Sequence, residues 1–169
     1  ESLAVSVVGE RIVESVLRLL FVDAATLWLL QPDGSMLGVN SAGAARDRYP
    51  AGKVVMPRGT GMPGRAVSEG GPVWSGDVLS DNIPYSEEIR DLFLTRGSVA
   101  ALAVPFRMQG KIIGALIASD SVGRKFSDGE VALLQTFASQ AGIALEQARL
   151  HEETERRRRE AEELAEVAR

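Results

Sequence analysis

The sequence predicts an α+β domain with one antiparallel β-sheet, the two terminal helices on one face and short helices on the other. Three observations lead to this prediction. An amphipathic stretch, Leu3 to Leu20, begins the chain, and the two most apolar segments, Val99 to Phe106 and Ile112 to Ala118, are separated by a short polar turn. A strongly capped helix starts after Phe126 and continues toward the C-terminus. Strands joined by hairpin turns pair antiparallel, and helices must cover the apolar faces.

Composition restricts the function classes. The chain has 169 residues, of which 45% are hydrophobic and 25% charged, and its net charge is −4. An acidic chain without a basic patch is not expected to bind nucleic acid. The chain has no cysteine, which excludes disulfides, thiolate metal sites and thioether-linked chromophores. No run of about 18 apolar residues occurs. We therefore expect no membrane insertion, and a cytoplasmic location.

The first half of the chain predicts one helix and three short strands. Apolar residues recur at helical spacing from Leu3 to Leu20. Thr26 to Leu30 and Met36 to Ser41 are predicted to form a hairpin around Pro32 to Ser35, where proline fixes φ and glycine accepts a positive φ. Lys53 to Met56 is predicted as a short third strand, and Val73 to Trp74 as a later strand at the sheet edge.

Gly59 to Gly64 matches G-x-G-x-x-G, the dinucleotide-binding pattern, but its context argues against that function. Pro63 lacks the N–H that a pyrophosphate would need, and the helix that follows ends at Gly70, too early to cross back to a parallel strand. We interpret the segment as a glycine turn that leads into a short helix. A second short helix is predicted from its N-cap, Ser86, to Arg96.

The C-terminal helix is the strongest local prediction. Ser127 and Glu130 form a capping box, and Phe126 and Val131 stand at hydrophobic-staple positions. A helix from there to Arg169 would be roughly 63 Å long, at about 1.5 Å per residue, whereas a core of this size has a diameter of roughly 35 Å. The helix should therefore project from the domain. We divide the chain into a domain, 1–150, and a helical coiled-coil linker, 151–169.

The projecting helix predicts a parallel homodimer, because an isolated helix is marginal in water unless its apolar stripe is buried. A dense stripe runs along the first half of the helix, and a thin heptad seam, interrupted at Thr154 and Arg157, continues it. The N-terminal helix is expected beside it in the dimer. The expected dimer and signalling positions are Leu134, Phe137, Ala141, Leu145, Ala148, Leu150, Ala161 and Leu164.

Six blocks of the sequence, in this order and spacing, resemble the GAF domain family. They are Gly59–Arg65, Gly71–Val73, Ala103–Phe106, Ile113–Leu116, the helix start Phe126–Asp128, and Gln140–Leu145. The resemblance spans about Leu3 to Leu150 and implies a non-enzymatic small-molecule sensor in a bacterial protein such as a sensor histidine kinase, within a two-component system, or a nucleotide cyclase. It implies a ligand pocket between the sheet and the short helices. The tail resembles the helical linkers between such modules.

The resemblance also suggests where a ligand would bind. Arg65 opens a helix, where donors can hold an anion, although an ion pair with Glu69, four residues on, is the favoured explanation. Four aromatic residues are expected near the pocket or in the plain core: Trp74, Tyr85, Phe93 and Phe106. Members that bind cyclic nucleotides carry Asn-Lys where this chain has Ser119-Asp120, and bilin-binding members use a cysteine. We therefore expect neither ligand, and no cofactor.

The remaining motifs favour structural roles. His151 is the lone histidine and lies past the domain, so we expect a solvated residue rather than a metal or haem ligand. We interpret the acidic residues between Asp77 and Asp91 as helix and turn caps rather than catalytic groups, since no nucleophile or base accompanies them. Arg156 to Arg159 alternates with glutamates as a salt-bridged helix surface. The alternative to a sensor is a structural dimerisation module whose pocket is unused; an enzyme has no supporting constellation.

Overall fold

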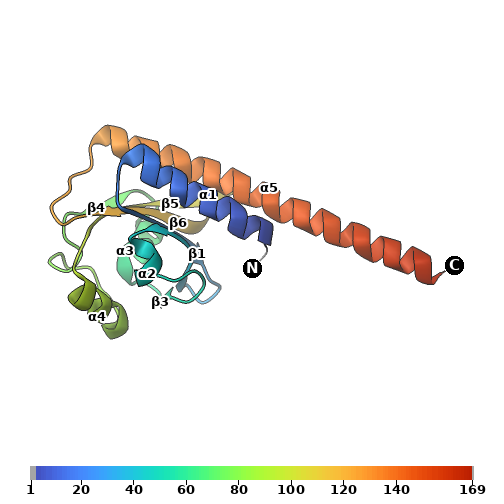
Figure 1. Ribbon diagram of the computed structural model, residues 1–169, viewed down its shortest axis with the longest axis horizontal. Helices are drawn as coiled ribbons and strands as arrows, with labels where there is room; N and C mark the ends of the chain where they lie inside the picture. The colour runs from blue at the N-terminus through green and yellow to red at the C-terminus, as the bar shows by residue number, and fades with distance from the viewer. Residues whose placement is uncertain (1–2, 169) are drawn as a thin grey trace.

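A six-stranded antiparallel sheet with the strand order β3-β2-β1-β6-β5-β4 forms the centre of the computed structural model, which describes residues 3–168 (Figure 1). The helices are α1 (Leu3–Leu20), α2 (Ala45–Arg48), α3 (Gly61–Glu69), α4 (Glu87–Arg96) and α5 (Asp128–Val167). The strands are β1 (Ala24–Leu30), β2 (Met36–Gly43), β3 (Val55–Met56), β4 (Val73–Ser75), β5 (Ala100–Met108) and β6 (Lys111–Asp120). The predicted fold class is confirmed.

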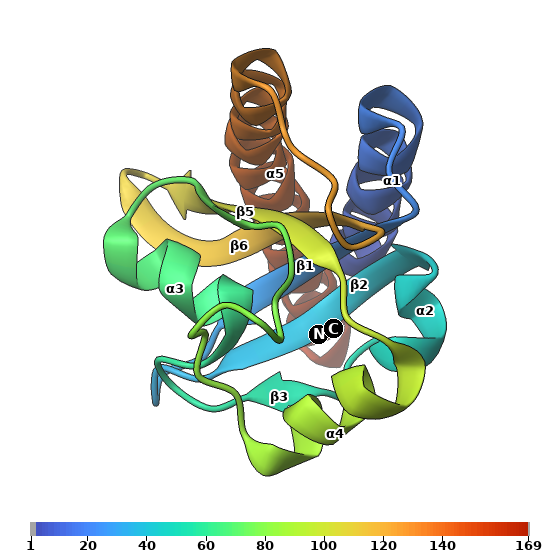
Figure 2. The same cartoon turned by 90° about the vertical axis from the view of Figure 1, so that its left-hand side faces the viewer.

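Helices cover both faces of the sheet. The terminal helices α1 and α5 lie side by side on one face, and α2, α3 and α4 lie over the other (Figure 2). Successive residues of a strand point to opposite faces. On β6, therefore, Leu116 and Ala118 belong to the core beneath α1 and α5, whereas Ala115 and Ile117 belong to the core beneath the short helices. The sheet thus separates two hydrophobic cores.

The start of α5 is fixed by polar contacts. The predicted capping box is present: the Ser127 hydroxyl accepts from the Glu130 amide at 3.1 Å, and the Glu130 carboxylate accepts from the Ser127 amide at 3.0 Å. Arg124 pairs with the same carboxylate at 2.5 Å and with Asp120 at 2.6 Å, and donates to the Leu20 carbonyl at 3.2 Å. One guanidinium therefore ties the ends of α1 and β6 to the start of α5.

Farther along, α5 passes unusually close to the sheet at Gly142. A Cβ atom at this position would lie 2.1 Å from the Arg107 carbonyl oxygen. Real side chains do not approach a carbonyl so closely, so only glycine permits this packing distance. Residues of α5 on either side of Gly142, Leu134 and Leu145 among them, are buried in the same core.

The second half of α5 leaves the domain, as predicted (Figure 1). The Ala4 amide donates to the Glu152 carboxylate at 2.7 Å, whereas residues 156–168 are exposed. Arg157 pairs with Glu153 at 2.7 Å, as expected for a salt-bridged surface. The structure follows the helix to Val167, and its predicted end, Arg169, lies outside the described residues. Among residues 3–168, no helix is long and apolar enough to cross a membrane.

Two local details depart from the prediction. The single-turn helix α2 was not predicted, because four residues carry no apolar period. In α5, three of the positions assigned to the dimer seam, Leu134, Ala141 and Leu145, are buried against the domain's own sheet. The monomer core covers Leu134 and Leu145, whereas Ala141 also lines the groove between α1 and α5.

Candidate functional site

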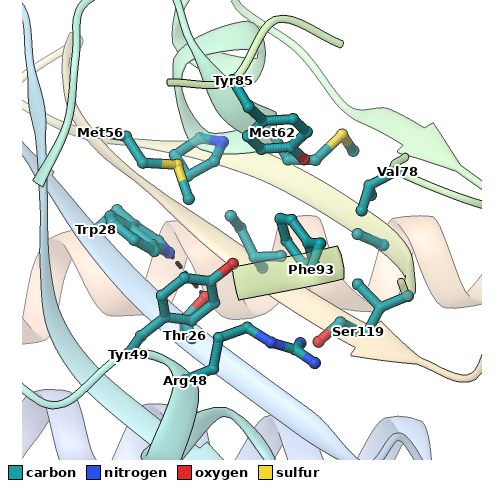
Figure 3. Close-up of a pocket in the computed structure, with 14 residues that line it drawn as sticks. Thr26, Trp28, Arg48, Tyr49, Met56, Met62, Val78, Tyr85, Phe93 and Ser119 are labelled. Atoms are coloured by element: carbon teal, nitrogen blue, oxygen red, sulfur yellow. Dashed lines mark hydrogen bonds between the residues drawn. The ribbon is translucent and has the colours of Figure 1, made fainter. Parts of the chain in front are cut away.

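A small cavity lies between the sheet and the short helices, on the face opposite α1 and α5 (Figure 3). Its volume is about 30 Å³. Strands β1, β5 and β6 form its floor, and α2, α3, α4 and the loops between them form its walls. The lining residues are Thr26, Trp28, Arg48, Tyr49, Met56, Met62, Pro63, Val78, Tyr85, Phe93, Val99, Ala101, Ile117 and Ser119.

Aromatic rings dominate the walls. Trp28 and Tyr49 pack edge to face with centroids 5.2 Å apart, and Tyr85 and Phe93 do the same at 5.2 Å. The Trp28 indole N–H donates to the Thr26 hydroxyl at 2.8 Å, which satisfies the indole and fixes the ring. Burial raises the pKa of Tyr49 and of Tyr85 well above the ordinary value, so both phenols remain protonated donors at neutral pH.

Arg48 is the one charged residue among those that line the cavity. Its guanidinium carbon lies 5.1 Å from the centroid of Phe93 and 6.0 Å from that of Tyr49. One terminal nitrogen donates to the Gly97 carbonyl over a long 3.5 Å. The Nε atom is buried and has no hydrogen-bond partner among residues 3–168. The Arg48 charge acts on both tyrosines, because it opposes the effect of burial on each phenol pKa.

The short helix α2 sets the direction of Arg48. The Tyr49 amide donates to the Ala45 carbonyl at 2.8 Å, and the Ser41 hydroxyl donates to the Tyr49 carbonyl at 2.6 Å, which holds this turn against β2. Arg46, two residues earlier, binds Glu10 on α1 at 2.7 Å. Residues two apart on a helical turn face different directions. Arg46 therefore reaches the terminal-helix side, and Arg48 reaches the cavity.

Two of the five predicted ligand-binding residues, Tyr85 and Phe93, line the cavity. Arg65 is exposed and forms the alternative ion pair with Glu69, with 3.6 Å between nitrogen and oxygen. Trp74 is 64% exposed on the edge strand β4, and Phe106 is 1% exposed beneath α1 and α5. The placement of these three at the cavity is corrected.

Strand alternation explains two of these corrections. On β5, Ala101 and Ala103 face the short helices, so Leu102 and Phe106 face the terminal helices. Trp74 pairs in register with Leu102, and residues paired across two strands share one face of a sheet. Both aromatic residues therefore stand at strand positions whose side chains point away from the cavity.

The sequence analysis missed Arg48, Tyr49 and several residues of the floor. Thr26 offered a signal, because it is the one polar residue of β1, and Ser119 directly follows the apolar run of β6; the structure buries both. The two are close across β1 and β6, where Thr26 is in register with Ile117. Arg48 offered no such signal, since its role depends on the position of the unpredicted helix α2.

The acidic residues near the cavity serve as turn acceptors. Asp77 accepts from the Ser98 hydroxyl at 2.5 Å and from the Leu79 amide at 3.1 Å, and its hydrogen bonds to serine hydroxyls lower its pKa. Asp81 accepts from the Ser75 hydroxyl. Ser86 caps α4, as predicted, by accepting from the Ile89 amide. No group of residues in the described range 3–168 has the arrangement to hold a metal ion.

Comparison with known proteins assigns a family to the fold described above. The family profile described as "GAF domain" matches residues 2–146. A GAF domain of an Acinetobacter phosphoenolpyruvate-protein phosphotransferase is 18% identical, with a TM-score of 0.71 over 90% of this chain and 89% of that one. The GAF-B domain of DevS from Mycobacterium smegmatis is 18% identical, with a TM-score of 0.69 over 89% and 98%.

A domain from Sinorhizobium meliloti, assigned to a two-component sensor histidine kinase, is 20% identical, with a TM-score of 0.64 over 88% of this chain and 94% of that one. Identities this low support the fold alone. The family profile, however, covers most of the chain, from the first turn of α1 to the middle of α5. The chain therefore belongs to the GAF domain family.

Proposed function

We propose that this chain is a non-enzymatic, small-molecule-sensing GAF module of a multidomain bacterial signalling protein, with its output domain joined through α5. The observation that carries the proposal is the cavity at Arg48, which has hydroxyl and guanidinium donors on an apolar aromatic surface. Such a mixture of apolar walls and a few polar groups is typical of ligand sites. Domains of similar fold occur in a phosphotransferase and in a protein assigned as a sensor kinase.

A short path leads from the cavity to the helix that leaves the domain. Ser119 lines the cavity, and the next residue, Asp120, pairs with Arg124. Arg124 in turn binds Glu130 in the first turn of α5. A ligand changes this helix only through different affinities for two arrangements of the domain. We propose the end of β6 as the element through which the two arrangements differ.

We also propose that the domain forms a parallel homodimer through the outer face of α1 and α5. A groove between the two helices is lined by apolar residues from both, including Val8, Ile12, Phe137 and Ala144, and also by Arg11, Ser15 and Gln140. Ile143, 59% exposed, lies beside it on α5. Farther along the helix, Leu150 and Leu164 are exposed. These residues replace Leu134 and Leu145 in the proposed interface; Ala141 lines the same groove, and Ala148 and Ala161 continue the interface along α5.

The alternative is a dimerisation module whose cavity is unused. The observation in its favour is the cavity volume of about 30 Å³, which is far below that of an ordinary ligand pocket. Under this alternative, α1 and α5 still associate, but no small molecule affects them.

Native mass spectrometry of freshly purified protein distinguishes the two functions. We expect a retained small molecule that raises the melting temperature when added back. Protein that carries nothing and melts at the same temperature with every metabolite extract would contradict sensing. Sedimentation tests assembly: we expect a dimer at tens of micromolar that loosens when the chain is cut after Leu150. Only monomer in the full chain would exclude the proposed dimer.

A further inference from the structure

The Arg48 guanidinium, which has no ion-pair partner among residues 3–168, indicates the chemical class of the ligand. The Nε atom of Arg48 is buried without a hydrogen-bond partner among the described residues, and the one hydrogen bond of the side chain is 3.5 Å long. A buried donor on a cation is unfavourable unless an acceptor reaches it. We propose that the cavity binds a small carboxylate with an apolar body, whose carboxylate pairs with Arg48. This inference rests on the proposed sensing function.

The other polar groups of the cavity are also donors. The Thr26 hydroxyl accepts from the Trp28 indole, so its own hydrogen remains available. Within residues 3–168, no hydrogen bond joins the hydroxyl of Tyr49, Tyr85 or Ser119 to another residue; the phenols stay protonated because burial raises the pKa of each. No carboxylate of the described residues lines the cavity. A site made of donors around one cation selects an acceptor group with a negative charge.

The Arg48 guanidinium extends from α2 across the cavity toward Ser119, beneath the ring of Phe93 (Figure 3). Asp23 lies near enough for the Arg48 charge to lower its pKa, although burial and Asp120 raise that pKa more. No ion pair joins Asp23 to Arg48 in the described structure. The Arg48 charge therefore has no ion-pair partner in the part of the chain that the structure describes, and a ligand would supply one.

Size and shape favour a carboxylate over a phosphate. A volume of about 30 Å³ holds roughly two water molecules, which is close to the space of one carboxylate group. A planar carboxylate matches the fork of a guanidinium, whereas a phosphate dianion would bring a second charge without a second cation. Met56, Met62, Val78 and Phe93 surround the rest of the site, so the body beyond the carboxylate should be apolar.

A larger ligand body requires a wall to move, and α4 is the wall most suited to do so. Only Ile89 and Phe93 of this helix are buried. Phe93 covers Arg48, and its ring contacts Tyr85. The methionines Met56 and Met62 adapt their shape readily, because their side chains are unbranched. Displacement of Phe93 by an apolar ligand body would thus open the site without disturbing the sheet.

The test compares small acids with their neutral amides by ¹⁵N-edited NMR on the full chain. The probes are benzoate, isobutyrate and phenylacetate, each against its primary amide. We expect the acids to shift the Trp28 indole N–H signal and to leave that of exposed Trp74 in place. In Arg48→Gln, the dissociation constant of each acid should rise about tenfold or more, as expected for loss of a charge-assisted hydrogen bond. Arg48→Lys should retain part of the affinity.

Arg46→Gln is the matched control, because Arg46 lies on the same turn but binds Glu10 and Glu14 on α1. It should bind the acids as the parent does. Equal shifts from acids and amides, or an Arg48→Gln variant with unchanged affinity, would overturn the carboxylate assignment and leave small-molecule sensing intact. If no probe shifts the Trp28 signal, the carboxylate assignment is also overturned. The proposed sensing function is tested separately, by native mass spectrometry. A folded spectrum of each variant establishes that the comparison is valid.

Discussion

The two faces of the sheet differ in how completely side chains fill the space between the sheet and the helices that cover it. Beneath α1 and α5, the side chains of Val13, Leu116 and Leu134 are 0% exposed, and Gly142 lets the helix approach the sheet backbone. On the other face, short helices and loops leave a cavity with an unpaired cation and free hydroxyls among the described residues. At these positions the face beneath α1 and α5 is closely packed, which stabilises the domain, whereas the other face retains freedom to change what its cavity holds.

Truncation of adjacent residues on β6 should give the largest measurable difference between the faces. Leu116→Ala should lower the free energy of unfolding by about 3 kcal/mol, since it removes a fully buried side chain from a filled core. Ile117→Ala should cost about half as much, because Ile117 already borders the cavity and has fewer contacts to lose. Urea denaturation measures both. Equal losses would show that the two faces are packed alike.

A glycine substitution on α5 should give the next largest effect. Gly142→Ala should destabilise the domain by about 2 kcal/mol, even though alanine is the better helix former, because its Cβ would collide with the Arg107 carbonyl. Gly129→Ala in the first turn is the control, with its nearest contact at 3.8 Å. It should leave stability unchanged or raise it by up to about 1 kcal/mol. Thermal unfolding measures both variants. A Gly142→Ala variant that is no less stable than the parent would contradict the close approach of α5.

The pH dependence of stability should report on the polar link at the start of α5. The pKa of Glu130 is below its ordinary value of 4.5, first because of the Ser127 amide and then because of Arg124. A lowered pKa in the folded state stabilises the domain above pH 4.5, and this contribution disappears as the pH falls through the folded value. Glu130→Gln should therefore lose about 0.5–1 kcal/mol at pH 7, and the difference from the parent should shrink as the pH falls below 4.5. A difference that stays constant from pH 7 to pH 3 would exclude the ionic contribution.

Two surface substitutions should have the smallest effects. Arg65→Ala and Trp74→Ala should each change the free energy of unfolding by less than about 0.5 kcal/mol, because both side chains are exposed. Neither should alter the affinity for a ligand of the Arg48 cavity, since neither residue lines it. The affinity of each variant for a small carboxylate is measured by titration calorimetry. Weaker binding in either variant would show that the binding site lies nearer to β4 than the Arg48 cavity.

Local signals predicted most of the fold. The capping box at Ser127 and the cap at Ser86 act within a single turn of chain, so their residue types suffice to identify them. The cavity was harder to predict, because its walls meet only through tertiary packing. Tyr85 and Phe93 were found as aromatic residues near a predicted helix, whereas Arg48 depends on a one-turn helix with no sequence period. Phe106 was misplaced because apolar strands with two covered faces hide which face each residue takes.

The unsupported half of α5 has a mechanical consequence. Since an α-helix rises about 1.5 Å per residue, the segment after Leu150 extends about 25 Å, and a tilt of about 5° at its base displaces its end by about 2 Å. The base of this lever lies where α5 leaves the domain, beside the start of α1, where the Ala4 amide donates to the Glu152 carboxylate. Rearrangements at the sheet too small to alter the fold would thus be amplified into displacements large enough to shift the contacts of whatever the helix carries.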